Sequence, residues 1–265
     1  MSTPDLPVPP ADALADDHRF AAWAATVAGE RLNEVRTEGL EGRELKDAGD
    51  KAAHDLLVAI LAEHRPGDAV LSEEGKDDKA RLEADRVWIV DPLDGTREFS
   101  EPPRDDWAVH VALWQRTDGS TGDLVAGAVA QPGLGTTFHT GAPPVVPERT
   151  SDRPRIAVSR SRPPAFVQAL AEEIGAELVP MGSAGAKVIS VARDVTDAYV
   201  HAGGQYEWDS AAPVAVARAA GLFTSRTDGS PLVYNQDDVW LPDLVVCRPA
   251  LADTIVDWIR RNGTE

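Results

Sequence analysis

The feature that most constrains this chain is an apolar stretch that runs directly into two aspartates, a glycine and a threonine. It reads Trp88-Ile89-Val90-Asp91-Pro92-Leu93-Asp94-Gly95-Thr96. The apolar residues predict a strand, and the Gly-Thr pair can open a helix. A turn here brings both carboxylates and the Leu93 carbonyl to one side, and hard divalent cations prefer such oxygens. The alternative is an ordinary Asp-Gly turn with Asp91 solvated at a strand end.

Other acidic residues fall where strands end or helices are predicted to begin. Sites in α/β proteins are assembled at such positions, so these acids are candidate partners of the two aspartates. They are Glu73 after a strand at 69–72, Asp50 before a helix at 51–65, and Asp209 before a helix at 210–220. The alternative is that Asp50 and Asp209 are plain helix N-caps and Glu73 is a solvated loop acid.

Helical and extended patterns alternate along the chain, which predicts a layered α/β or α+β sandwich. Prolines crowd the first ten residues and 141–154. They predict a flexible N-terminal arm over 1–11, an N-terminal α+β lobe over 12–142 and a C-terminal α/β lobe over 143–265. The further predicted helices are 12–36, 165–175 and 251–261, with an apolar-rich segment at 187–192 and strands at 86–90, 107–114, 124–131, 155–159, 198–200 and 244–247.

The charge balance limits the possible partners. The chain has 26 Lys+Arg against 44 Asp+Glu, for a net charge of −18. Bulk electrostatics therefore argues against nucleic acid polymers and anionic membranes, and an anionic substrate needs a local reversal of sign. The single cysteine, Cys247, excludes an intramolecular disulfide and a cysteine-based zinc site, and it is expected to be buried. With no leader or membrane-spanning pattern, we expect a cytoplasmic protein.

One window of this acidic chain is basic. Arginine binds phosphate in a bidentate manner, so the window predicts a contact to a second phosphate, away from the carboxylates. Arg160, between Ser159 and Ser161 at a predicted strand end, is the member expected to face the ligand. The alternative is a proline-rich linker with solvated arginines. The arginines are Arg149, Arg153, Arg155, Arg160 and Arg162.

Taken together, these motifs resemble the inositol monophosphatase family of magnesium-dependent, lithium-sensitive phosphatases, over roughly residues 12–260. The resemblance rests on Asp91-Pro92-Leu93-Asp94-Gly95-Thr96, on Glu73 upstream, and on Trp208-Asp209-Ser210-Ala211-Ala212 downstream. Within the family, Arg97-Glu98-Phe99 and Val158-Ser159-Arg160-Ser161 are similar to the 3′-phosphoadenosine-5′-phosphate (PAP) phosphatases of the CysQ type. The resemblance implies the layered α-β-α-β-α order of the sandwich.

The resemblance also implies roles for individual residues. Glu73, Asp91 and the Leu93 carbonyl would hold a first magnesium ion, and Asp91, Asp94 and Asp209 a second. Asp50 would assist a third ion and the attacking water, although the preceding residues 46–49 depart from the family pattern. Thr96 would orient that water, so Thr96, Asp50 and Glu73 are the expected catalytic residues. The expected substrate contacts are Gly95, Thr96, Ser159, Arg160, Ser161, Gly185 and Lys187.

The implied activity is removal of the 3′-phosphate from PAP, a by-product of sulfate assimilation, with the sulfated nucleotide PAPS as a further substrate. Two to three Mg²⁺ ions per site are expected, with Mn²⁺ able to substitute and Li⁺ inhibitory. The alternatives are activity on inositol monophosphate or fructose 1,6-bisphosphate, and a metal- or nucleotide-binding protein without catalysis. A homodimer is a further expectation. We also expect Asp91 and Asp94 to lie in a solvated cleft, so that replacing either with alanine abolishes turnover and spares the fold.

Overall fold

The computed structural model describes residues 6–119, 121–148 and 153–264. Its helices are α1 (Ala11–Ala15), α2 (Asp17–Val35), α3 (Gly42–His64), α4 (Thr96–Phe99), α5 (Ala165–Ile174), α6 (Ala184–Ala192), α7 (Glu207–Ala219) and α8 (Ala252–Asn262), with short 3₁₀ turns η1 (Lys79–Glu83), η2 (Pro132–Leu134) and η3 (Pro249–Leu251). Its strands are β1 (Ala69–Ser72), β2 (Arg86–Asp94), β3 (Ala108–Asp118), β4 (Thr121–Gln131), β5 (Thr136–His139), β6 (Arg155–Ser159), β7 (Glu177–Met181), β8 (Ala198–Tyr206), β9 (Phe223–Ser225) and β10 (Trp240–Cys247).

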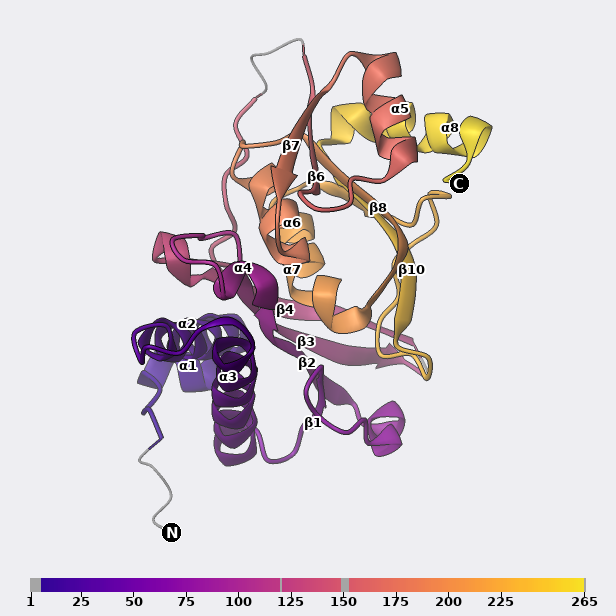
Figure 1. Ribbon diagram of the computed structural model, residues 1–265. Helices are drawn as coiled ribbons and strands as arrows, with labels where there is room; N and C mark the ends of the chain where they lie inside the picture. Colours follow the sequence, from indigo (N-terminus) through magenta and orange to yellow (C-terminus); the bar gives the residue numbers. More distant parts are fainter. Residues whose placement is uncertain (1–5, 120, 149–152, 265) are drawn as a thin grey trace.

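Helices and sheets stack in five layers (Figure 1). The first sheet has the order β1-β2-β3-β4-β5, and the second has the order β7-β6-β8-β10-β9. Helices α2 and α3 cover the outer face of the first sheet, α6 and α7 lie between the sheets, and α5 and α8 cover the outer face of the second. This arrangement confirms the predicted α-β-α-β-α sandwich.

The central strands are apolar on both faces because each face meets a helical layer. In β2, Trp88 and Val90 join the core beneath α2 and α3, whereas Val87 and Ile89 join the core shared with α7. This alternation follows from the two-residue period of a strand. Both faces of β2 are therefore shielded from solvent up to Asp91, the first of its two aspartates.

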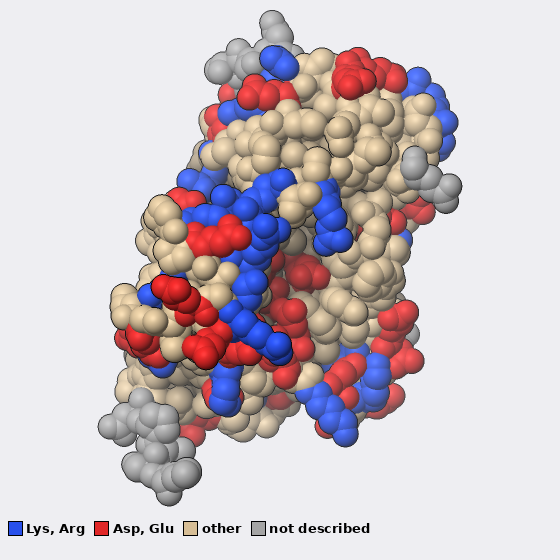
Figure 2. Space-filling view, in the orientation of Figure 1, with Lys and Arg blue, Asp and Glu red and all other residues tan. Residues whose placement is uncertain are grey.

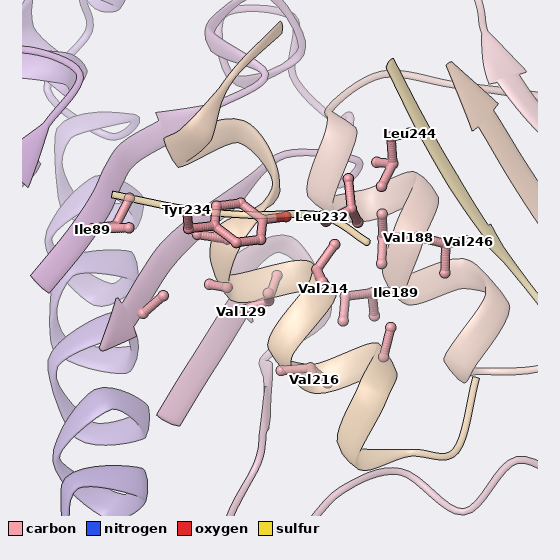
Figure 3. Packing of buried hydrophobic residues seen from close by; sticks show 14 of the residues in the cluster. Ile89, Val129, Val188, Ile189, Val214, Val216, Leu232, Tyr234, Leu244 and Val246 are labelled. Carbon is pink, nitrogen blue, oxygen red and sulfur yellow. The ribbon is translucent and has the colours of Figure 1, made fainter. Parts of the chain in front are cut away.

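The middle layer connects the two sheets. Figure 3 shows Val188 and Ile189 of α6 packed together with Val214 and Val216 of α7, beside residues of both sheets. The α7 backbone approaches β4 so closely that a Cβ at Gly127 would lie 2.7 Å from the Cβ of Ala215. The second half of the chain thus contributes directly to the core of the first sheet, and residues on α6 and α7 are held in fixed positions relative to β2.

Several element bounds differ from the sequence predictions. The helix predicted at 12–36 is two helices, because the Asp16 carboxylate caps α2 by accepting from the N–H groups of His18 and Arg19. The helix predicted at 51–65 begins at Gly42, so Asp50 lies within it and the N-cap assignment was wrong. The segment at 187–192 is helical, and β5, β7 and β9 were not predicted.

The chain passes from the first sheet to the second between His139 and Arg155, the proline-rich range where the lobe boundary was predicted. Of the proposed N-terminal arm, residues 1–5 lie outside the described residues, and α1 begins at Ala11. Cys247 is fully buried in β10, as expected. Among the described residues, no helix combines the length and apolar character needed to cross a lipid bilayer.

Candidate active site

The end of β2 turns its two aspartates to one side through a bulge. Asp91 pairs with His110 and Asp94 with Ala108 on β3, so the β2 side holds one extra residue between these pairs. Pro92 fits here because a bulge does not require its missing N–H. The Leu93 N–H donates to Asp91 Oδ1 at 3.0 Å. Gly95 follows as the N-cap residue of α4 and has φ of +86°, a backbone conformation that glycine adopts without strain.

Asp94 is held by the start of α6. Its carboxylate accepts from the N–H groups of Ala184 at 3.1 Å and Gly185 at 2.6 Å, and from the hydroxyl of Ser183. His110 Nε2 lies 3.3 Å from Asp94 Oδ2. Burial alone would raise the pKa of Asp94, but the contact from His110 and these hydrogen bonds hold it at about 2. Asp94 is therefore ionised at neutral pH.

His110 lies beneath this loop and is completely buried. Its Nδ1 bonds the Trp208 carbonyl at 3.1 Å, so Nδ1 must carry a proton there. Burial lowers the pKa of His110, but Asp94 outweighs it and the net shift is upward. A Cβ on Gly185 would lie 2.0 Å from His110 Nε2, so only glycine allows the α6 backbone to approach this close.

Asp91 lies close to several other carboxylates. It is 1% exposed, and no donor among the described residues reaches its Oδ2. Glu73 follows β1 and reaches toward solvent, and its carboxyl group lies within hydrogen-bonding reach of Asp91. Burial, followed by the charges of Glu73 and Asp94, raises the pKa of Asp91 well above its usual range. Crowding by protein atoms, together with the charge of Asp209, raises the pKa of Glu73 to about 7.

Asp209 comes to the same place from the first turn of α7. Its Oδ2 accepts from the Tyr206 N–H at 2.6 Å, so it caps the helix from its third position and not as the predicted N-cap residue. Burial and the charge of Asp94 raise its pKa to about 6. Carboxylate oxygens of Asp91, Asp94 and Asp209 all lie within 4.8 Å of one another.

This donor set fits a divalent cation. Several carboxylates converge, one buried oxygen has no donor among the described residues, and burial together with mutual repulsion raises the pKa values of three of the acids. A dication removes that repulsion. The environment of the two aspartates differs from the expectation, however. Asp91 and Asp94 are 1% and 8% exposed, so they are buried between layers and do not lie in a solvated cleft.

A second group of residues lies beside the carboxylates. The Thr96 hydroxyl is 3.2 Å from the Leu93 carbonyl and 3.5 Å from Asp50 Oδ1. Burial and the charge of Glu74 raise the pKa of Asp50 to about 7. Asp50 reaches Thr96 from the middle of α3 because Gly49 lets the helix pack tightly, where an added Cβ would lie 2.6 Å from the Phe99 ring.

A cavity of about 660 Å³ opens beside Asp209. Ser159 and Lys187, two of the predicted substrate contacts, line it together with Arg162. The Lys187 ammonium group donates to the Gly182 and Ser183 carbonyls, which ties it to the loop that holds Asp94. Figure 2 shows acidic side chains in the hollow between the two halves of the molecule and basic side chains along its edge.

Other predicted substrate contacts lie apart from this cavity. Arg160 bonds Glu98 at 2.6 Å and Glu101 at 2.7 Å, so its guanidinium joins the second sheet to the α4 region. Ser161 is exposed and does not line the cavity. Arg155 pairs with Asp194 and Asp197, and Arg149 lies outside the described residues. Of the arginines of the basic window that the structure describes, Arg162 is the one that lines the cavity.

Sequence reasoning missed several residues of the site. The contact of His110 with Asp94 depends on the pairing of β2 with β3, which places His110 opposite Asp91. Ser183 belongs to a small-residue loop, and its hydroxyl bonds to Asp94 cannot be read from the sequence. Tyr206 and Trp240 line the cavity from strands that are distant in sequence, and no local pattern indicates this.

Comparison with known proteins agrees with this geometry. The model of the inositol monophosphatase family matches residues 16–260. The chain is 51% identical, over 92% of its length and 93% of the relative, to a 3′-phosphoadenosine 5′-phosphate phosphatase from Mycobacterium leprae.

Solved structures show the same fold. An inositol monophosphatase from Staphylococcus aureus superposes with a TM-score of 0.77 at 22% identity, covering 92% of this chain and 93% of that one. CysQ from Bacteroides thetaiotaomicron superposes with a TM-score of 0.72 at 29% identity, covering 86% and 96%. This chain belongs to the inositol monophosphatase family.

Proposed function

We propose that this protein is a magnesium-dependent phosphomonoesterase that removes the 3′-phosphate of adenosine 3′,5′-bisphosphate, the reaction class of 3′(2′),5′-bisphosphate nucleotidases. The observation that carries the proposal is the position of the cavity. It opens beside Asp209 of the carboxylate cluster, has room for a nucleotide, and is also lined by the basic residues Lys187 and Arg162. The activity named for the M. leprae relative at 51% identity supports the same substrate.

Magnesium would be held by Asp91, Asp94 and Asp209, with Glu73 and the Leu93 carbonyl completing the set and Asp50 assisting a further ion. Bound magnesium would supply positive charge to the phosphoryl oxygens and lower the pKa of water. By resemblance, two to three ions act, manganese substitutes and lithium inhibits. The buried, donor-poor position of Asp91 supports its role as the central ligand.

Thr96 and Asp50 would together take the proton from the attacking water. The Thr96 hydroxyl lies within reach of the Asp50 carboxylate. A hydroxyl that donates to a carboxylate keeps its lone pairs free to accept from a water molecule. Thr96 would therefore orient the water, and Asp50 would accept the proton passed through the hydroxyl. Gly95 is expected to leave room for the phosphate at the start of α4.

The second phosphate of the substrate would lie toward Lys187 and Arg162. Lys187 is buried and its pKa is lowered, chiefly by burial, although Asp94 and other acids partly restore it. Two of its three donors bond loop carbonyls, which leaves one for a ligand. The predicted substrate contacts also include Ser159, Arg160, Ser161 and Gly185. Arg160 would act by holding α4 in place through its bonds to Glu98 in that helix and to Glu101 just after it.

Parallel phosphate-release assays with Mg²⁺ test this proposal on adenosine 3′,5′-bisphosphate, inositol 1-phosphate and fructose 1,6-bisphosphate. We expect the highest kcat/KM for the nucleotide. A higher value for either of the other substrates would overturn the choice of substrate while retaining the phosphatase. Absence of metal-dependent activity on all three would favour a binding protein without catalysis.

A further inference from the structure

The cavity beside Asp209 has an aromatic wall that the site described above does not use. Trp240 begins β10, Tyr206 ends β8, and the two residues are direct partners in the antiparallel ladder. Trp240 is 45% exposed and Tyr206 is 42% exposed, and both line the cavity. Large aromatic rings exposed inside a concave site indicate a ligand more often than a packing role.

The Trp240 ring is held in place by a glycine. A Cβ at Gly204 would lie 1.6 Å from Cζ2 of Trp240, so the indole rests directly on the Gly204 backbone. Gly204 has φ of +90°, a conformation that other residues rarely adopt. One side of the indole is therefore covered by a backbone that can carry no side chain, and the exposed remainder of the ring faces the cavity.

Tyr206 connects this wall to the carboxylates. Its ring stacks on Trp208 with centroids 4.8 Å apart and meets Trp240 edge-on at 5.3 Å. Its backbone N–H donates to Asp209. The aromatic cluster and one of the proposed metal ligands are thus fixed by the same residue, and a ligand lying against Trp240 extends toward Asp209 within one cavity.

The aromatic wall differs in charge from the other parts of the cavity lining. Among the described residues that line the cavity, Asp209 is the single acid, and Arg162, Lys187 and His201 are the basic residues. Around Trp240 the lining includes Tyr206, Gly204 and His201. The His201 ring bonds the Gly204 carbonyl at 2.9 Å, and burial lowers the pKa of His201, which favours its uncharged form. An uncharged aromatic wall suits a flat heterocycle, whereas phosphate groups suit the basic and metal-binding parts.

We propose that Trp240 is the surface on which the purine base of the substrate stacks, and that it thereby selects nucleotides over phosphate esters without a base. The inference rests on the proposed nucleotidase function and adds the specificity-determining residue. Stacking of a base on an aromatic side chain contributes about 1–3 kcal/mol, equivalent to roughly 5- to 150-fold in affinity.

The kinetic test compares Trp240→Ala and Trp240→Phe with the parent protein. For W240A we expect KM for adenosine 3′,5′-bisphosphate to rise by about tenfold or more, with kcat changed by less than about threefold, because stacking contributes equally to ground state and transition state. The ratio of kcat/KM for the nucleotide to that for inositol 1-phosphate should fall by the same factor. W240F should recover most of the loss. Val233→Ala, an exposed apolar residue outside the cavity lining, is the matched control and should change neither value.

A binding measurement without metal separates this inference from the proposed function. Adenosine 5′-phosphate should quench the tryptophan fluorescence of the parent protein, and ribose 5-phosphate, which lacks the base, should not. The quenching should be absent in W240F, which keeps an aromatic ring but removes the indole. Two results would overturn the role of Trp240. One is quenching that persists in W240F, and the other is an equal loss in W240A of the activities on adenosine 3′,5′-bisphosphate and on inositol 1-phosphate. A parent protein that binds adenosine 5′-phosphate through Trp240 and fails to hydrolyse the bisphosphate would contradict the proposed reaction alone.

Discussion

At the scale of single residues, the two aspartates of the β2 motif have opposite environments. Asp94 accepts hydrogen bonds from Ser183, Ala184 and Gly185, whereas no donor among the described residues reaches Oδ2 of Asp91. The same residue type has its pKa lowered at one position and raised at the other. Asp94 therefore organises the loop before α6, and Asp91 is the carboxylate left for the proposed cation.

Asp91→Asn should remove activity and spare the fold. We expect at least about 100-fold loss of kcat, the size of effect seen when a key electrostatic group is lost. The raised pKa of Asp91 means that its ionisation costs stability, and this cost grows as pH rises toward the folded-state pKa. With a chelator at pH 8, the Tm of the variant should therefore be no lower than that of the parent. A clear drop in Tm would contradict the assignment of Asp91 as a buried acid whose ionised form is destabilised.

Asp94→Asn should also lose activity, but with a loss of stability. An amide cannot accept all the hydrogen bonds that the carboxylate accepts from the α6 start, and it loses the charge paired with His110. We expect the free energy of unfolding to fall by about 2 kcal/mol. Urea denaturation of both variants under the same conditions measures this contrast. Equal stability of the two variants would show that the loop contacts of Asp94 contribute little.

At the scale of elements, the η1 turn is tied to the loop between β9 and β10. Arg81 is 1% exposed and donates to Asp77, to Asn235 at 2.6 Å and to the Gln236 carbonyl at 2.8 Å. Glu207, at the start of α7, accepts from the N–H groups of Asn235 and Gln236. Through these contacts the loop supports the helix that carries Asp209.

Asp77→Asn tests this connection. Hydrogen bonds from Arg81, together with Lys79, hold the pKa of Asp77 at about 2, below its ordinary value of 3.8. Folding thus favours the ionised form, and the free energy of unfolding of the variant should be lower by about 2 kcal/mol at pH 7. This is an upper value because Asp77 is partly exposed to solvent. Because the folded-state pKa is lowered, this contribution is present above about pH 4 and declines as pH falls toward about 2. Urea denaturation at pH 7 and pH 3 should give a larger difference between parent and variant at pH 7. A difference that does not depend on pH would contradict this account.

The element scale also explains what could be predicted from the sequence. Strong local patterns were sufficient to predict β2, β6, and the positions and order of the site motifs along the chain. Apolar runs and turn residues determine such features within a few positions. Helix α3 was misjudged because Gly49 was treated as outside the helix, whereas it marks the close contact with Phe99. The short strands β5, β7 and β9 depend on pairing with distant partners, which leaves no local signal.

The residues of the site divide in the same way, into those that local patterns predict and those that depend on tertiary contacts. The carboxylates of Asp91, Asp94 and Asp209 were predicted from two motifs, and the structure brings them together. The buried role of His110 and the bonding of Arg160 to Glu98 depend on tertiary contacts between layers. The aromatic wall of Trp240 and Tyr206 depends on strand register, which single-sequence patterns do not specify.

At the scale of the whole molecule, the acidity of the chain acquires a local explanation. Five acids, Asp50, Glu73, Asp91, Asp94 and Asp209, lie at or beside one site, and in the family's arrangement magnesium ions would offset their charge. The basic residues Lys187 and Arg162 line the adjoining cavity. A chain with a net charge of −18 can in this way present a site suited to a phosphate ester.

The most direct test of the central claim is the identity of the product formed from adenosine 3′,5′-bisphosphate. The parent protein, with Mg²⁺, should give adenosine 5′-phosphate and one equivalent of inorganic phosphate, resolved by liquid chromatography. Asp91→Asn under the same conditions should give neither. Formation of adenosine 3′-phosphate, or an undiminished rate in Asp91→Asn, would contradict the account.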